Sequence, residues 1–311
     1  MGSLITVILP VFLLIGAGYA ATRFARFPEV GIDGLMRFTQ NYAFPCLLFR
    51  AVSTFDIGEQ FHAPLLLSYY SAALICFVLG FLAALLIFKR DLEDAVVIGF
   101  CCLFSNTLML GLPITERAFG PDALEANFAI IAIHAPFCYT LGIAMMEVVR
   151  ARGSGLNPFG IMAQIARQLA RNPLVIALML GFVVNLGGIT IPLPIADAVD
   201  MMVAASVPAA LFAVGGVLVQ YRIEGDLRVV LMICLITLVV HPALVWGFGR
   251  YAALDVAQFR SALITAAVAP GINTYVFANL YNRAKRVAAS SVLVTTSGSL
   301  LTVWLWLTIL P

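Results

Sequence analysis

Two Asn-Thr pairs lie inside long apolar segments, one pair in each half of the chain. Asn106 and Thr107 lie within S-N-T-L-M-L-G-L-P, and Asn273 and Thr274 lie within A-P-G-I-N-T-Y-V-F-A. Amide and hydroxyl groups both donate and accept hydrogen bonds, so together they can surround a carboxylate without a permanent charge. The alternative is that these amides only satisfy backbone groups that a break in each helix sets free.

Proline and glycine accompany both pairs, and this combination predicts broken helices. Pro113 and Pro270 remove a backbone donor, while Gly111 and Gly271 permit unusual backbone angles. A break frees N–H groups at the start of the next half-helix, where the positive end of the helix dipole attracts anions. A matched pair of interrupted apolar segments is the best sequence indicator of a transporter's substrate site.

Three further polar residues are candidates for the wall of such a site. His134 is the histidine nearest the middle of an apolar segment, and it can donate to a carboxylate or carry a proton near neutral pH. A packing histidine is the alternative. Tyr139 and Asn41 are weaker candidates. Arg50, near the outer end of its segment, is expected to snorkel to the surface or to attract anions to an outer vestibule.

The composition indicates an integral membrane protein. Of 311 residues, 62% are hydrophobic and 11% are charged, and the mean hydropathy is +1.02. A net charge of +2 gives no indication of nucleic-acid binding. The six cysteines show no metal-ligand spacing with the histidines, so we expect no metal and no cofactor. No hydrolase triad, H-E-x-x-H motif or nucleotide-binding loop is present, which argues against an enzyme.

Ten apolar segments are each near the length that crosses a bilayer, about 20 residues. Most of the 18 basic residues follow the odd-numbered segments, so those connections are expected to be cytoplasmic and both termini to lie outside. The segments are Leu4–Arg23, Leu35–Val52, Pro64–Phe88, Ala95–Ile114, Phe128–Val149, Pro173–Gly188, Ile195–Val219, Val229–Phe248, Ser261–Tyr281 and Val287–Leu310.

The two halves of the chain repeat each other at a nearly constant offset. F-P-C-L-L-F around Pro45 corresponds to V-P-A-A-L-F around Pro208, and both prolines are expected to kink otherwise regular helices. Five segments per half would place the second half upside down in the membrane. The sequence therefore predicts an inverted repeat of residues 1–150 and 173–311, with a cytoplasmic link over 151–172.

These motifs resemble the auxin efflux carrier family, which includes plant PIN-FORMED carriers and bacterial permeases for malonate and related carboxylates. The resemblance covers nearly the whole chain. It is carried by L-P-V-F-L-L-I-G-A-G-Y, F-P-C-L-L-F, N-T-L-M-L-G-L-P, H-A-P-F-C-Y-T-L and P-G-I-N-T-Y-V-F-A. It departs from the plant members at Asn41, Ser105, His134 and the Asn273-Thr274 pair, whereas Tyr139 is kept.

The resemblance implies an all-α fold of ten transmembrane helices in which broken segments four and nine cross, as in bile acid sodium symporters. Segments 1, 2, 6 and 7 would form a scaffold, through which the resemblance suggests a homodimer. Segments 3 to 5 and 8 to 10 would form the transport domain. Size and resemblance together suggest a bacterial inner membrane.

Three functional classes follow from these observations. The first is a secondary transporter of a small organic anion such as malonate or malate, working by alternating access, with the lipid bilayer as its other partner. The second is a sodium-coupled symporter, which the absence of acidic residues from both motifs disfavours, although Asn, Thr and carbonyl oxygens can bind sodium. The third is a membrane receptor or sensor that transports nothing.

Overall fold

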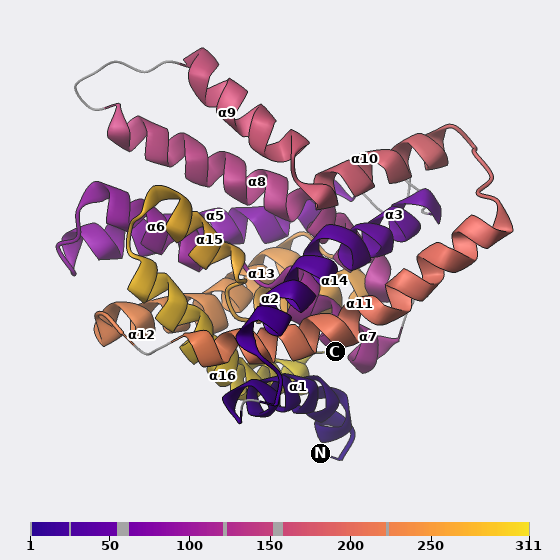
Figure 1. Ribbon diagram of the computed structural model, residues 1–311. Coiled ribbons are helices and arrows are strands. Elements are labelled where there is room, and N and C mark those ends of the chain that lie inside the picture. Colours follow the sequence, from indigo (N-terminus) through magenta and orange to yellow (C-terminus); the bar gives the residue numbers. More distant parts are fainter. Residues whose placement is uncertain are drawn as a thin grey trace. The chain divides into compact units, whose positions relative to one another are not determined.

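The protein is all-helical in the residues that the structure describes. The computed structural model describes residues 2–24, 26–54, 62–120, 123–151, 158–221 and 224–310. Within these ranges every regular element is a helix, and the one β-type contact is an isolated bridge (Figure 1). The all-α prediction is therefore confirmed.

Helices occupy all ten predicted apolar segments, and some segments contain more than one. The first half contains α1 (Gly2–Arg23), α2 (Glu29–Phe38), η1 (Thr39–Ala43), α3 (Phe44–Thr54), α5 (Ala63–Leu86), α6 (Leu92–Leu103), η2 (Thr107–Gly111), α7 (Leu112–Phe119) and α8 (Leu124–Arg150). The second contains α10 (Pro173–Leu186), α11 (Leu193–Gln220), α12 (Leu227–Leu235), η4 (Ile236–Val240), α13 (His241–Tyr251), α14 (Val256–Ala266), α15 (Asn273–Tyr281) and α16 (Lys285–Ile309). The η segments are π-helical.

Five stretches in the described residues are both long enough and apolar enough to cross a membrane. They are α5, α8, α11, the continuous stretch Leu227–Tyr251 and α16. Two shorter apolar helices are Ile8–Arg23 and α10. Within the predicted link, residues 152–157 lie outside the described ranges, and α9 (Pro158–Ala170) forms a helix that the sequence reading did not anticipate. The chain is a multi-pass membrane protein.

Each π-helical segment ends two residues before a proline. Proline has no N–H to donate to the carbonyl four residues before it, and its ring clashes with that carbonyl. A π-type turn widens the helix locally and relieves this clash. The pairs are η1 with Pro45, η2 with Pro113 and η4 with Pro242. Pro208 differs, because it lies inside the uninterrupted α-helix α11.

The chain divides into two compact units. Unit 1 comprises Met1–Ile8, Phe61–Ile165 and Tyr221–Pro311, and unit 2 comprises Leu9–Gln60 and Ala166–Gln220. Unit 1 therefore contains both Asn-Thr pairs and also His134. Asn41 belongs to unit 2.

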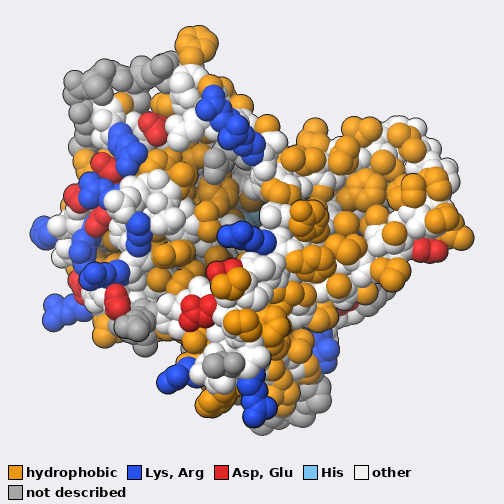
Figure 2. Space-filling model, in the orientation of Figure 1, with side chains coloured by type: hydrophobic (Ala, Val, Ile, Leu, Met, Phe, Trp, Pro, Cys, Tyr) orange, Lys and Arg blue, Asp and Glu red, His pale blue; other side chains and the backbone are white. Residues whose placement is uncertain are grey.

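Unit 2 is held together by close helix packing and one ion pair. Helix α11 packs on α2 and α3, and α10 packs on α3. A Cβ atom at Gly18 would lie 1.9 Å from the carbonyl oxygen of Phe212, so α1 and α11 meet backbone to backbone. Arg50 pairs with Asp200, with 2.7 Å between Nε and Oδ1. We expected Arg50 either to snorkel to the surface or to attract anions. Neither expectation included this ion pair. Figure 2 shows an extensive hydrophobic surface over α10.

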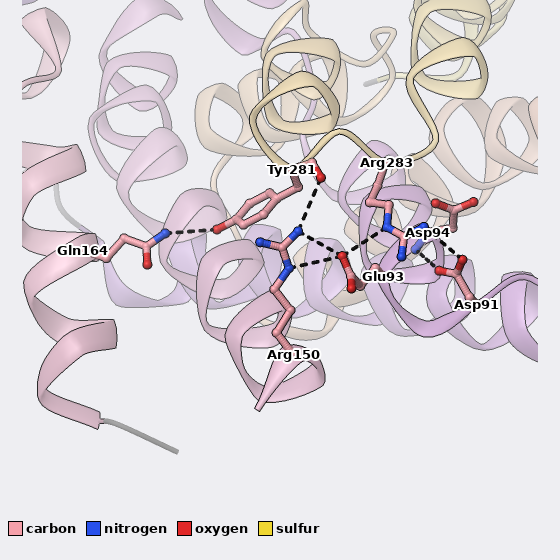
Figure 3. Close-up of polar contacts among 7 residues, drawn as sticks. All are labelled: Asp91, Glu93, Asp94, Arg150, Gln164, Tyr281 and Arg283. Carbon is pink, nitrogen blue, oxygen red and sulfur yellow. Dashed lines mark hydrogen bonds and ion pairs between the residues drawn. The ribbon is translucent and has the colours of Figure 1, made fainter. Parts of the chain in front are cut away.

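Unit 1 carries a cluster of charged side chains at one end (Figure 2). Glu93, in the first turn of α6, accepts hydrogen bonds from Arg150 at 2.9 Å and from Arg283 at 3.1 Å (Figure 3). Arg283 also pairs with Asp91 at 3.3 Å, and Arg150 lies over the ring of Tyr281. The hydrogen bond from Arg283, followed by that from Arg150, lowers the pKa of the Glu93 carboxyl. This cluster ties α6 and the end of α15 to α8.

Candidate substrate site at two helix breaks

Both predicted breaks exist, and each is defined by the helices on its two sides. Helix α6 ends at Leu103 and η2 begins at Thr107, so the first break covers 104–106. Helix α14 ends at Ala266 and α15 begins at Asn273, so the second covers 267–272. Neither break contains a charged residue.

The two breaks pair with each other through their backbones. The Asn106 N–H donates to the Ala269 carbonyl at 2.8 Å, and the Gly271 N–H donates to the Phe104 carbonyl at 3.1 Å. These bonds form an antiparallel bridge between Ser105 and Pro270. Because backbone groups away from water must find partners within the protein, the bridge explains how two unwound segments are tolerated in an apolar chain.

The side chain of Asn106 caps the helix that follows the first break. Its Oδ1 accepts a hydrogen bond from the Met109 N–H at 3.2 Å, and its backbone carbonyl accepts from Leu110 and Gly111. A backbone N–H can only donate, so the oxygen of the carboxamide must face Met109 and the NH₂ must face away. Asn106 therefore does satisfy a backbone group set free by the break, but it uses only its amide oxygen to do so.

Asn273 begins α15 and has a similar arrangement at the second break. Its Oδ1 accepts from the Tyr139 hydroxyl at 3.4 Å, so the structure brings these two predicted residues together. The Thr274 hydroxyl donates to the Gly271 carbonyl at 2.8 Å and stabilises the break itself. Thr107 is buried in the first turn of η2.

Both asparagine NH₂ groups are left as donors. Within the described ranges, no hydrogen bond uses Nδ2 of Asn106 or Asn273. The half-helices η2 and α15 both start here, so their positive dipole ends meet at the bridge. The region therefore combines hydrogen-bond donors with positive partial charge and has no fixed ionic charge, which suits an anion.

His134 lies in an aromatic enclosure beside the first break. It is 2% exposed, and the Phe104 ring meets it edge-on with 4.7 Å between ring centroids. Tyr69 and Tyr70 pack against it from α5, and Cys138 Sγ lies 3.9 Å from both ring nitrogens. Phe104 itself takes part in the bridge, through its carbonyl. His134 thus lies against the bridge, as its position in the sequence suggested.

Sequence reasoning missed two residues of this region, Ser105 and His241. Ser105 Oγ and His241 Nδ1 are 3.4 Å apart, and both residues are buried. His241 follows η4 and directly precedes Pro242. A histidine beside a proline in an apolar segment was the available signal, but the contact with Ser105 joins distant parts of the chain.

The structure places four other predicted residues as follows. Gly111 adopts ordinary right-handed helical angles, with φ −59° and ψ −53°, and its distinctive feature is its contact with Thr265 of α14, which a Cβ would approach to 3.4 Å. Pro113 lies beyond the first break, inside α7. Gly271 does not have a positive φ either. Asn41 is an exposed residue of η1 in unit 2.

Comparison with known proteins places the chain in a family. A family model described as "Membrane transport protein" matches residues 3–307. The chain belongs to this family, the auxin efflux carriers. Auxin efflux carriers are transporters and not enzymes, in agreement with the lack of catalytic motifs.

Three relatives illustrate what the chain is similar to. A Rhizobium meliloti (strain 1021) protein named "Putative malonate transporter" is 26% identical over 97% of this chain and 94% of its own length. The "Uncharacterized transporter YfdV" of Escherichia coli (strain K12) is 23% identical over 96% and 95%. The "Uncharacterized transporter MJ1031" of Methanocaldococcus jannaschii is 24% identical over 96% of both chains.

Proposed function

We propose that this protein is a secondary transporter of a small organic carboxylate, such as malonate or malate, that works by alternating access. One observation carries the proposal: both asparagines at the bridge use their amide oxygens within the protein and keep their NH₂ groups as donors. A carboxylate accepts hydrogen bonds and needs such donors. The name of the Rhizobium meliloti relative supports this substrate class.

The proposed site contains Asn106 and Asn273 as the principal donors. His134 and Tyr139 line its wall, and Thr107 and Thr274 shape the two half-helix starts. Asn41, in unit 2, stays a proposed substrate-binding residue. No metal or cofactor is part of this proposal.

We propose the wider architecture on the same basis. Ten spans form an inverted repeat of residues 1–150 and 173–311, joined by 151–172, with spans four and nine crossing at the bridge. The backbone pairing of the two breaks supports this crossing. The division into two units supports unit 2 as scaffold and unit 1 as transport domain. The proposed setting is a bacterial inner membrane with both termini outside, and the scaffold is the proposed surface of a homodimer.

A sodium-coupled symporter is the second candidate, and the same geometry disfavours it. Sodium would need oxygen ligands, as other hard cations do. The Asn106 and Asn273 amide oxygens each already accept a hydrogen bond within the protein. A receptor without transport is the third candidate, and it would bind an anion without moving it.

The membrane potential gives the direction of uncoupled transport. One charge crossing 100 mV changes free energy by about 2.3 kcal/mol. An inside-negative potential of this size drives a monovalent anion outward about forty-fold. Export is therefore the expected direction without coupling, and uptake requires a co-transported cation.

Transport into proteoliposomes tests the proposal. Labelled malonate is supplied to vesicles containing wild type or Asn106→Ala, with separate proton and sodium gradients and with unlabelled malate, succinate, indole-3-acetate or taurocholate as competitors. The expected result is uptake that dicarboxylates inhibit and Asn106→Ala abolishes. Uptake that persists in the variant places the site elsewhere. Binding without flux supports the receptor, and dependence on sodium supports the symporter.

A further inference from the structure

Ser105 lies beside a cluster of three titratable side chains in unit 1, those of His241, Tyr69 and His134. Its Oγ lies 3.4 Å from His241 Nδ1. The Tyr69 ring packs against the His241 ring. The His134 ring packs against Tyr69 and against Phe104, the residue before Ser105. The three titratable side chains come from α5, α8 and α13, whereas Ser105 itself is part of the bridge. The bridge is thus in contact with a cluster of ionisable groups.

Two polar atoms of this cluster are buried and unpartnered. Neither Tyr69 Oη nor His241 Nε2 has a hydrogen-bond partner among the residues that the structure describes. Both residues are fully buried, and their rings are in contact, with 5.3 Å between centroids. Tyr70, by contrast, satisfies its hydroxyl on the Ile130 carbonyl at 2.6 Å. Buried polar atoms without partners are rare in folded proteins, so this pair calls for a functional explanation.

Within the ranges that the structure describes, no charged side chain is in contact with His241 to neutralise a proton there. The titratable groups facing it are Tyr69 from α5 and His134 from α8, with Tyr70 and Cys138 beyond them. Arg250, on the same helix, lies over Trp246 and Phe259 instead. On the neighbouring α14, Arg260 lies over Phe119. A carboxylate bound at the bridge would be the first anion to approach this cluster.

We propose that His241 is the proton-binding residue that couples anion transport, a role that rests on the proposed function. In the tautomer whose Nδ1–H donates to Ser105 Oγ, Nε2 has a free lone pair. A proton from water on the side that supplies the anion binds Nε2, forms an N–H bond and is released on the other side. Ser105 is the positioning residue that connects the ring to the bridge. His134 and His241 both pack against Tyr69. A proton on one therefore opposes a proton on the other, and the cluster carries one.

This assignment has a consequence for the direction of transport. An anion and an imidazolium attract each other, so binding of either favours binding of the other by the same factor. One proton per anion cancels one negative charge during the crossing. A dicarboxylate such as malonate carries two negative charges near neutral pH, so one proton per anion would halve the outward bias of the membrane potential. A pH gradient, more acidic outside, would then add a driving force for uptake.

Calorimetry of the purified full-length protein with malonate tests the assignment. Titrations in two buffers of different ionisation enthalpy measure the protons taken up per anion bound. Wild type and the control His62→Gln, altered at an exposed histidine before α5, should take up about one proton above the pH at which His241 binds its proton. Their malonate Kd should rise about tenfold per pH unit there. His241→Gln should bind malonate and take up none.

Size-exclusion chromatography and thermal unfolding would show whether His241→Gln folds. If it does not fold, a second variant still tests the assignment. Ser105→Ala keeps His241 but removes its side-chain contact, and it should move the pH profile of the malonate Kd. An unchanged profile in Ser105→Ala, or proton uptake retained in His241→Gln, overturns the assignment. If His134→Gln loses proton uptake and His241→Gln keeps it, the proton-binding residue is His134. Malonate binding without proton uptake in wild type refutes this inference only, whereas no binding of malonate, malate or succinate refutes the proposed function as well.

Discussion

Replacement of Asn106 by Asp should separate the two uses of this side chain. The aspartate keeps an oxygen for the Met109 N–H, so the cap of η2 survives. It loses the NH₂ donor and adds a negative charge where the anion is proposed to bind. A hydrogen bond to a charged partner contributes about 1.5–3 kcal/mol, which corresponds to a Kd increase of about 10- to 150-fold.

Asn106→Ala should behave differently, because it removes the cap as well. Loss of an asparagine cap lowers the free energy of unfolding by about 0.5–2 kcal/mol. The measurements are malonate Kd by calorimetry and thermal unfolding in detergent for wild type and both variants. Asn279→Asp is the matched control, since it adds the same charge at an exposed position of α15. Wild-type affinity in Asn106→Asp, or equal stability of the Asp and Ala variants, would refute the reasoning.

Three further predictions concern the framework around the site. Glu93→Gln weakens partly exposed ion pairs and should lower the free energy of unfolding by about 1 kcal/mol at pH 7. Because the folded-state pKa of Glu93 is lowered, the difference from wild type should shrink as the pH falls below the ordinary glutamate range and through the folded pKa. Thermal unfolding at about pH 7 and about pH 3 measures this difference. Gly18→Ala places a methyl group against the Phe212 carbonyl and should reduce the yield of folded protein on size-exclusion chromatography, whereas Gly16→Ala, with open space around it, should not. Thr265→Val removes the acceptor of the 2.7 Å hydrogen bond from Asn127 and should lower the free energy of unfolding by about 1–3 kcal/mol, and an unchanged denaturant midpoint would contradict this.

The sequence predicted both breaks because their signals are local. A proline, a glycine and an Asn-Thr pair in an otherwise apolar run are unusual enough to mark an interruption. The exact position of the first break was harder to predict from the sequence. Pro113 indicated a break near itself, but a π-helical turn accommodates this proline, and the chain unwinds several residues earlier, at Ser105. A local pattern does not reveal whether a proline breaks a helix or widens it.

The partners of the site residues were not predictable for a different physical reason. The contacts of Tyr139 with Asn273 and of Ser105 with His241 join helices from opposite halves of the chain. The ion pair between Arg50 and Asp200 does the same. Such contacts depend on which helix faces meet, and helical periodicity identifies an apolar face without identifying its neighbour.

The bridge between the breaks has a consequence for how the protein is made. The Phe104 carbonyl and the Asn106 N–H find their partners at Gly271 and Ala269, about half the chain later in synthesis. Until those residues emerge from the ribosome, the first broken segment has backbone groups that lipid cannot satisfy. We therefore expect this segment to reach its final position late in biogenesis, held until then in water or by the insertion machinery. Neither half of the chain should complete its own broken helix alone.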